Sequence, residues 1–265
     1  MIRVSGASGF IGNAVLQYCL ANQIAVTGYS RSQSKSENIV QCDDYATIPA
    51  EGTLIHLAET RTVGELTPDD AEAQLRLSQQ LSRAGFRHIV YASSAAVYAP
   101  SIQRIDVTTG PFSTHRYGES KKQNEAVFAA AGATIARISN VYGPDMATNT
   151  AIGAVLQQCH ESHINVFNLS AVRDYIWVED VAAVLVNMAL HPKPGTYHVS
   201  TGAGTSVREL ISLATAAVGN RNYSVSESSP QIASGVVLNP QNTQVCYDWH
   251  HSVSISEGIR RLVRK

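Results

Sequence analysis

Residues 2–21 read IRVSGASGFIGNAVLQYCLA, and this stretch decides the fold. The apolar run from Ile2 to Ser5 predicts a strand, and apolar residues at helical spacing from Asn13 to Ala21 predict a helix. Between them lie three glycines, Gly6, Gly9 and Gly12. Glycines in this position let the backbone approach a pyrophosphate, whose charge the helix N-terminus stabilises. The stretch therefore predicts a strand, a phosphate-binding turn and a helix.

The same alternation continues along the first half of the chain. Strands are predicted at 24–29, 53–57, 88–93 and 133–138, and helices at 68–84 and 117–131. Strands that alternate with helices form right-handed crossovers and a parallel sheet covered on both faces. The fold class is therefore α/β, with a Rossmann-type doubly wound parallel sheet.

The pattern becomes less regular after Gly143 and Pro144. Helices are predicted at 152–161, 179–190, 208–218 and 254–262, with short strands at 164–167 and 171–177. We expect residues 1–145 to form a dinucleotide-binding Rossmann domain. Residues 146–265 are then a small substrate-binding portion, partly interleaved with the Rossmann domain through 171–200.

Composition excludes several classes of function. The chain has 265 residues and a net charge of −1, so it lacks the field that would hold a nucleic acid or an anionic membrane surface. No apolar run approaches the roughly 20 residues that span a bilayer. The four cysteines form no Cys-x-x-Cys pair, and no basic and apolar leader follows Met1. We therefore expect a soluble, cytoplasmic protein with reduced cysteines.

The end of the second predicted strand bears on the choice of cofactor. A carboxylate is expected there when the adenosine ribose has a free 2′-hydroxyl, but this chain reads Tyr29-Ser30-Arg31-Ser32. Arg31 could pair with a 2′-phosphate bidentately, and Ser30 or Ser32 could donate a hydrogen bond to it. These residues favour NADP over NAD. The alternative interpretation is that Arg31 is a solvated loop cation.

Two motifs indicate proton-transfer chemistry. Tyr117 and Lys121 are four residues apart and so share one face of a predicted helix, where an ammonium favours the ionised phenol and can also hold a nicotinamide ribose. Ser94 follows a predicted parallel strand, at the carboxyl edge where such sheets bind ligands. A hydroxyl there could orient a substrate oxygen against Tyr117. The three candidate catalytic residues are therefore Tyr117, Lys121 and Ser94.

These motifs together resemble the extended short-chain dehydrogenase/reductases of the NAD-dependent epimerase/dehydratase type, which act on nucleotide sugars. The resemblance runs along the whole chain and implies roles for individual residues. The implied cofactor contacts are Gly6, Ser8, Gly9, Phe10, Ile11 and Gly12 in the first turn, Leu57 and Ala58 under the pyrophosphate, and Tyr117 and Lys121.

The resemblance also implies substrate contacts. Asn140, in the segment Arg137 to Pro144, is expected to face the substrate diphosphate, and Arg173 is expected to contact the nucleotide phosphate. Ser94 is expected to polarise the reacting oxygen. Both the amide and the guanidinium suit a diphosphate, and cofactor chemistry needs neither. The alternative for Arg173 is a surface pair with Asp174.

Departures from the family pattern narrow the reaction. Dehydratases resemble Thr-Asp-Glu where this chain has Ser94-Ala95-Ala96, and loss of water needs that extra acid and base, so dehydration is disfavoured. Glu59 stands where the family has a small residue after His-Leu-Ala. The C-terminal part is shorter than in typical members, which predicts a smaller or more open sugar pocket.

Three further expectations concern partners and metals. Asp43 or Asp44 is a candidate for binding the adenine amino group. His160, His163, His250 and His251 lack a third ligand at matching spacing, so we expect no metal site. By analogy with similar proteins, the helices at 68–84 and 117–131 are expected to form a homodimer contact.

The sequence thus predicts a nucleotide-sugar oxidoreductase, with a 4-epimerase as the first hypothesis. An epimerase would work through a transient 4-keto sugar. The alternatives are an NADPH-dependent nucleotide 4-keto-sugar reductase, which Arg31 favours, and a non-catalytic NADP-binding regulator. Such regulators usually lack the tyrosine and lysine pair that this chain retains.

Overall fold

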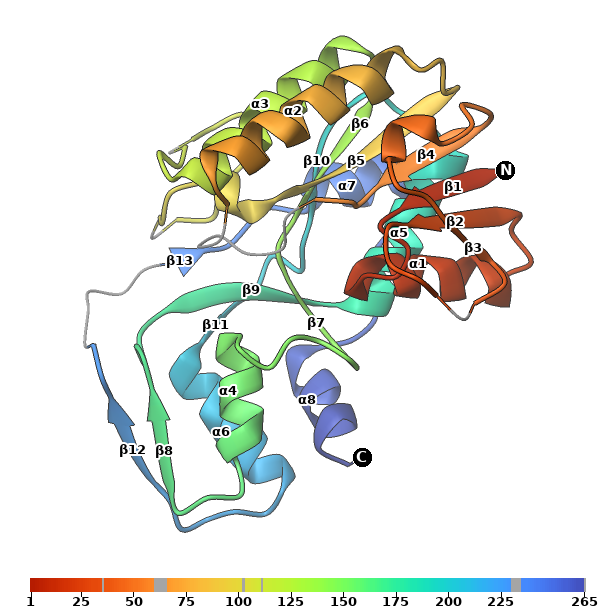
Figure 1. The fold of residues 1–265 in the computed structure, drawn as a ribbon. Coiled ribbons are helices and arrows are strands. Elements are labelled where there is room, and N and C mark those ends of the chain that lie inside the picture. Colours follow the sequence, from red (N-terminus) through yellow and green to blue (C-terminus); the bar gives the residue numbers. More distant parts are fainter. Residues whose placement is uncertain (35, 60–65, 102, 111, 230–234, 265) are drawn as a thin grey trace.

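The centre of the protein is a seven-stranded parallel sheet (Figure 1). A computed structural model describes residues 1–34, 36–59, 66–101, 103–110, 112–229 and 235–264. The strand order is β10-β6-β5-β4-β1-β2-β3. The strands are β1 (Ile2–Ser5), β2 (Val26–Ser30), β3 (Ile39–Gln41), β4 (Thr53–His56), β5 (His88–Ser94), β6 (Thr134–Ile138) and β10 (Gly195–Val199). The predicted α/β class and parallel sheet are confirmed.

Helices cover both faces of this sheet, as Figure 1 shows. On one face α1 (Phe10–Ala21) packs against α5 (Val178–Leu190), and on the other α2 (Pro68–Arg83) lies beside α3 (Arg116–Ala130). Every residue of β1, β4 and β6 is buried, including polar ones such as Arg3, His56 and Arg137, as expected of strands covered on both faces. The homodimer contact expected through α2 and α3 stays a prediction.

Capping residues determine where several helices begin. Thr67 precedes Pro68 and accepts a hydrogen bond from the Asp70 amide, while the Asp70 carboxylate accepts one from the Thr67 amide. Ser206 and Glu209 form the same reciprocal pair at the start of α6 (Val207–Ala217). Ser206 is therefore the residue that caps α6.

The elements outside this core, called the second unit below, form a four-stranded sheet, a strand pair and three helices in the described part of the chain (Figure 1). In the sheet, β9 (Val172–Trp177) pairs with β7 (Asn140–Tyr142), β11 (Gly204–Ser206) and β13 (Gly235–Val236), and β8 (His163–Val166) pairs with β12 (Ser224–Glu227). The helices of this unit are α4 (Ala151–Gln158), α6 and α8 (Ile255–Val263). The chain also returns to the central sheet through α5, β10 and the short helix α7 (Gln241–Tyr247). Two short 3-10 helices, η1 (Tyr45–Thr47) and η2 (Ala95–Val97), follow β3 and β5.

Several elements differ from the sequence-based expectation. Helix α1 begins at Phe10 rather than Asn13, because Gly12 has no side chain to collide with the turn: a Cβ there would lie 2.2 Å from the Gly6 carbonyl oxygen. The prediction missed β3, β7, β10, β11, β12, β13 and α7, which have two to seven residues each. Such short elements are held by their neighbours rather than by a pattern of their own. None of the described helices is long and apolar enough to cross a membrane.

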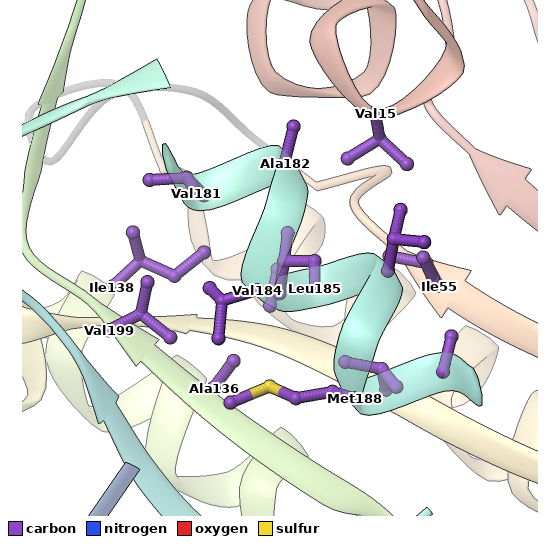
Figure 2. Packing of buried hydrophobic residues seen from close by; sticks show 14 of the residues in the cluster. Val15, Ile55, Ala136, Ile138, Val181, Ala182, Val184, Leu185, Met188 and Val199 are labelled. Atoms are coloured by element: carbon purple, nitrogen blue, oxygen red, sulfur yellow. The ribbon is translucent and has the colours of Figure 1, made fainter. Parts of the chain in front are cut away.

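Helix α5 fills the centre of the largest apolar cluster. Figure 2 shows Val184, Leu185 and Met188 facing side chains of α1 and of the strands β4, β6 and β10. All three are fully buried, at 0% exposure. Because α5 contacts both α1 and the sheet, it joins the second half of the chain to the Rossmann core.

We expect Leu185→Ala to lower the free energy of unfolding by about 2–5 kcal/mol, because it leaves a cavity between α5 and the sheet. Leu190→Ala is the matched control on the same helix. Leu190 is 46% exposed, so its loss should cost less than about 1 kcal/mol. Urea unfolding at pH 7 measures both. Equal effects would contradict this account of the core.

Candidate active site

The turn after β1 forms a cradle of backbone groups. Gly6 has φ +70°, and a Cβ on it would lie 3.1 Å from the backbone of Leu57 and Ala58. Gly9 precedes α1, and no side chain caps this helix. The amides of the first turn are therefore available to an anion, which fits the diphosphate of a dinucleotide. Ser8 is exposed on this turn, while Phe10 and Ile11 are half-buried in the first turn of α1.

The ends of β1 and β4 meet beneath this turn. The Ser5 hydroxyl lies 2.7 Å from His56 Nδ1 and accepts a hydrogen bond from the Leu57 amide at 3.1 Å. These contacts fix the chain that leaves β4, so Leu57 and Ala58 lie against Gly6. The structure thus brings together the two segments in which the sequence predicts cofactor contacts.

The end of β2 lies near a cavity of about 270 Å³ between β2 and α2. Its lining contains Arg31, Asp43, Asp44 and Tyr45, together with residues of α2. The Arg31 guanidinium carbon lies 5.6 Å from the centre of the Tyr45 ring. Ser30 is buried, and its hydroxyl contacts Ser8 Oγ at 2.7 Å and the Ser32 amide at 3.0 Å. The candidate residues for the adenosine end of the cofactor therefore share one region.

The three candidate catalytic residues lie where α3 meets the end of β5. Ser94 ends β5 and caps the short helix η2. Gly118 packs so tightly on η2 that a Cβ would lie 2.4 Å from the Ala96 carbonyl oxygen. This close approach brings the start of α3, which carries Tyr117, to the strand end that carries Ser94. Lys121 Nζ lies 5.8 Å from the centre of the Tyr117 ring and donates a hydrogen bond to the Ala92 carbonyl at 2.9 Å.

Lys121 also forms an ion pair that the sequence did not predict. Its Nζ lies 2.5 Å from Glu59 Oε2, and the two side chains are only 7% and 5% exposed. Burial alone would lower the pKa of Lys121, but the Glu59 carboxylate more than offsets this, so the pKa lies above its ordinary value. The sequence marked Glu59 as a departure from the family pattern, yet nothing in it indicated the partner.

The candidate substrate residues lie in paired strands of the second sheet. Asn140 begins β7 and is opposite Tyr175 of β9, two residues after Arg173. Asn140 Nδ2 donates to the Asp174 carbonyl at 3.3 Å, and Arg173 Nη1 donates to the Val172 carbonyl at 2.7 Å. Both side chains are partly exposed.

The alternative of a surface pair between Arg173 and Asp174 does not hold. Asp174 is fully buried, and its carboxylate accepts hydrogen bonds from Thr201 and Gly202 at 2.7–2.9 Å. Burial raises the pKa of Asp174, and these hydrogen bonds oppose the shift. Asp174 therefore ties β9 to the loop after β10. Within the described part of the chain, no group of three or more His, Cys, Asp or Glu residues is placed to hold a metal ion.

Comparison with known proteins identifies the family. The model of the NAD dependent epimerase/dehydratase family matches residues 2–200. The chain therefore belongs to this family, whose members are enzymes of the extended short-chain dehydrogenase/reductase type.

Individual relatives are distant but cover most of the chain. A UDP-glucose 4-epimerase of Caenorhabditis elegans is 26% identical, with 97% of this chain and 94% of the relative covered. A GDP-6-deoxy-D-mannose reductase of Pseudomonas aeruginosa is 27% identical, covering 79% and 77%. The solved UDP-glucose 4-epimerase of Thermus thermophilus, in complex with NAD, is 25% identical and covers 99% and 97%, with a TM-score of 0.83.

The prediction that NADP is favoured over NAD is wrong. The Thermus thermophilus epimerase, which shares this fold, holds NAD. The structure gives a physical reason why Arg31 misled the prediction. Arg31 stacks against Tyr45, and the carboxylates of Asp43 and Asp44 line the same cavity. Arg76 also lines the cavity but is paired with Glu72, so the carboxylates of Asp43 and Asp44 oppose the charge of a 2′-phosphate and offset the attraction of Arg31.

The free energy of unfolding should fall as the pH is lowered from 6.5 toward 4, because of His56. Burial lowers the pKa of His56 from 6.5 to about 4, so below pH 6.5 the unfolded chain takes up a proton that the folded protein does not. This contribution to stability is present above pH 6.5 and is lost as the pH falls toward 4. The loss is on the order of 3 kcal/mol. Urea unfolding between pH 7 and 4.5 measures it.

His56→Asn should flatten this pH dependence, because the variant lacks the titrating ring. His163→Asn is the control, since His163 is exposed on β8. Its pH dependence should match the wild type. A His56→Asn slope as steep as the wild-type slope would show that other groups account for the acid sensitivity.

Proposed function

We propose that this protein is a nucleotide-sugar 4-epimerase that uses NAD. The observation that carries the proposal is the convergence of Tyr117, Lys121 and Ser94 at the carboxyl edge of the sheet, on the same edge as the uncapped start of α1. This edge is where parallel sheets of this kind bind their ligands. The family and the relatives described above support the same reading.

The residues suggest how a bound cofactor would be held. The amides at the start of α1 would bind the diphosphate, Leu57 and Ala58 would lie beneath it, and Lys121 would hold the nicotinamide ribose. Asp43 or Asp44 would contact the adenine from the cavity beside β2. Bound NAD would supply a nicotinamide that can take a hydride from the sugar and return it to the opposite face.

The side chains would manage the protons and the reacting oxygen. Tyr117 as a phenolate would remove the proton of the C4 hydroxyl, and as a phenol it would return a proton to the 4-keto sugar. The ammonium of Lys121 favours the phenolate. Ser94 would donate a hydrogen bond to the C4 oxygen and hold it against Tyr117.

We assign Asn140 and Arg173 to the substrate diphosphate. Both lie on the paired strands β7 and β9, which connect the Rossmann core with the second unit: β7 follows β6, and β9 leads directly into α5. A guanidinium can bind phosphate oxygens in a bidentate manner, and an amide can donate a further hydrogen bond. The substrate class is therefore a nucleoside diphosphate sugar.

A 4-keto-sugar reductase is the second candidate. The similarity to the GDP-6-deoxy-D-mannose reductase favours it, because the same tyrosine can donate a proton to an existing ketone. The two candidates differ in their need for added reductant. An epimerase interconverts UDP-, GDP- or dTDP-sugars without consuming a reduced nicotinamide, whereas a reductase consumes one for each turnover. A panel of these sugars, assayed with and without the reduced cofactor, separates the two.

We expect Tyr117→Phe to reduce turnover by at least about 100-fold while cofactor affinity changes little, because the variant lacks only the proton-transferring hydroxyl. Turnover on the best substrate of the panel and cofactor titration by fluorescence measure the two effects. Tyr18→Phe is the control, since Tyr18 lies on α1 away from Ser94. Full turnover in Tyr117→Phe would exclude Tyr117 as the acid and base. No turnover in the wild type on any sugar would favour a non-catalytic nucleotide-binding protein.

NAD should bind more tightly than NADP by about tenfold or more, because Asp43 and Asp44 line the cavity together with Arg31. Isothermal titration of the apoprotein with each cofactor measures the difference. Asp43→Asn combined with Asp44→Asn should narrow it by improving the binding of NADP. Tighter binding of NADP by the wild-type protein would contradict this explanation.

A further inference from the structure

The carboxylate of Glu59 is fixed from three sides. Its Oε2 lies 2.5 Å from Lys121 Nζ, while Oε1 accepts hydrogen bonds from the Tyr91 hydroxyl at 2.9 Å and from Asn124 Nδ2 at 3.2 Å. Tyr91 belongs to β5, and Asn124 belongs to α3. Glu59 follows β4, so its carboxylate bridges β4, β5 and α3 at the edge of the sheet that carries the candidate catalytic residues.

The ammonium of Lys121 is correspondingly constrained. It donates to the Ala92 carbonyl at 2.9 Å and contacts Glu59, which accounts for two of its three N–H groups. Among the described residues, no acceptor meets the third. An ammonium that is only 7% exposed loses most of its hydration, and this favours the neutral amine unless a negative charge compensates.

The other titratable groups near Lys121 place no negative charge in direct contact with its ammonium. Glu125, on the same helix, is occupied by Arg137 in its own buried ion pair at 2.6 Å. His56 of β4 is neutral at pH 7, because burial lowers its pKa to about 4. The Tyr91 hydroxyl of β5 donates a hydrogen bond to Glu59 and keeps its proton, because burial holds its pKa well above the usual value. Tyr117, on the first turn of α3, is a phenol and carries a charge only when it ionises.

We propose that Glu59 is a positioning residue that keeps Lys121 charged and fixed beside Tyr117. Its role in turnover rests on the proposed function, whereas its effect on the protonation of Lys121 does not. The direction of the Lys121 pKa supports the proposal, since Glu59 is the strongest of the groups that raise it.

The test measures the protonation of Lys121 by NMR. Protein labelled with ¹³C-lysine gives one Cε resonance for each of five lysines, and loss of a peak in Lys121→Arg assigns Lys121. In the wild type, Lys121 should remain an ammonium at a pH where free lysine, added as a reference, has lost its proton. In Glu59→Gln the titration midpoint of Lys121 should fall by at least about one pH unit, a tenfold change in its protonation constant.

Two control variants make the result specific. Glu59→Asp retains the charge, so the Lys121 midpoint should stay closer to the wild-type value than in Glu59→Gln. Glu125→Gln breaks the other buried ion pair of α3 and should move the midpoint much less. An unchanged midpoint in Glu59→Gln, or an equal shift in Glu125→Gln, would overturn the proposal. If Glu59→Gln does not fold, a wild-type Lys121 midpoint below that of free lysine would overturn the proposal.

Turnover gives a second and separable result. In Glu59→Gln, activity should be lost above the new Lys121 midpoint and partly recovered below it, while the wild type keeps its activity over the whole range. A structural role alone would lower activity equally at all pH values. If Tyr117→Phe remains fully active but the NMR midpoints shift as expected, the proposed function fails and the role of Glu59 in Lys121 protonation stands.

Discussion

The close approach of α1 to the end of β1 is the constraint on which the rest of the structure depends. Gly12 packs where a Cβ would lie 2.2 Å from the Gly6 carbonyl oxygen, and Gly6 has a left-handed backbone at φ +70°. Any side chain at these positions would push the helix off the strand. With the helix in place, its uncapped start faces the same edge at which β4 and β5 end. This backbone contact thus aligns the cradle with the strand ends, and the contact of Gly118 with Ala96 adds the helix that carries Tyr117.

Much of this fold can be predicted from local sequence patterns, and the elements that the prediction missed have a common physical origin. The central strands contain Ile, Leu and Val because helices cover both of their faces, and α2 begins at Thr67-Pro68 because both residues favour a helix start. By contrast, β3 and β10 are short strands at the two edges of the sheet. An edge strand is held by one neighbour only: β2 holds β3, and β6, which is distant in the sequence, holds β10. No local period identifies either strand.

The candidate site likewise contains some residues that local patterns identify and others that only the tertiary structure reveals. Tyr117 and Lys121 could be found from a spacing of four residues, and Ser94 from its place after a strand. Arg31 misled because its effect depends on Tyr45, Asp43 and Asp44, which the fold brings to it. For the same reason, the sequence did not reveal that Lys121 pairs with Glu59. A charged residue shows its chemistry in the sequence, whereas the charge that it meets is a property of the tertiary structure.

Strand β10 gives the assembly of the molecule a definite order. It pairs with β6 from Gly195 to Val199, after the chain has passed through β7, α4, β8, β9 and α5. During synthesis, the first 145 residues leave the ribosome without the edge strand β10 and without α5, one of the two helices that cover one face of the sheet. Ala136 and Ile138 of β6 lack their contacts with Val199 and α5 until those segments have been synthesised. The first half of the chain therefore does not complete its fold before the second half is made, and its many long-range contacts predict slow, concerted folding with the second unit.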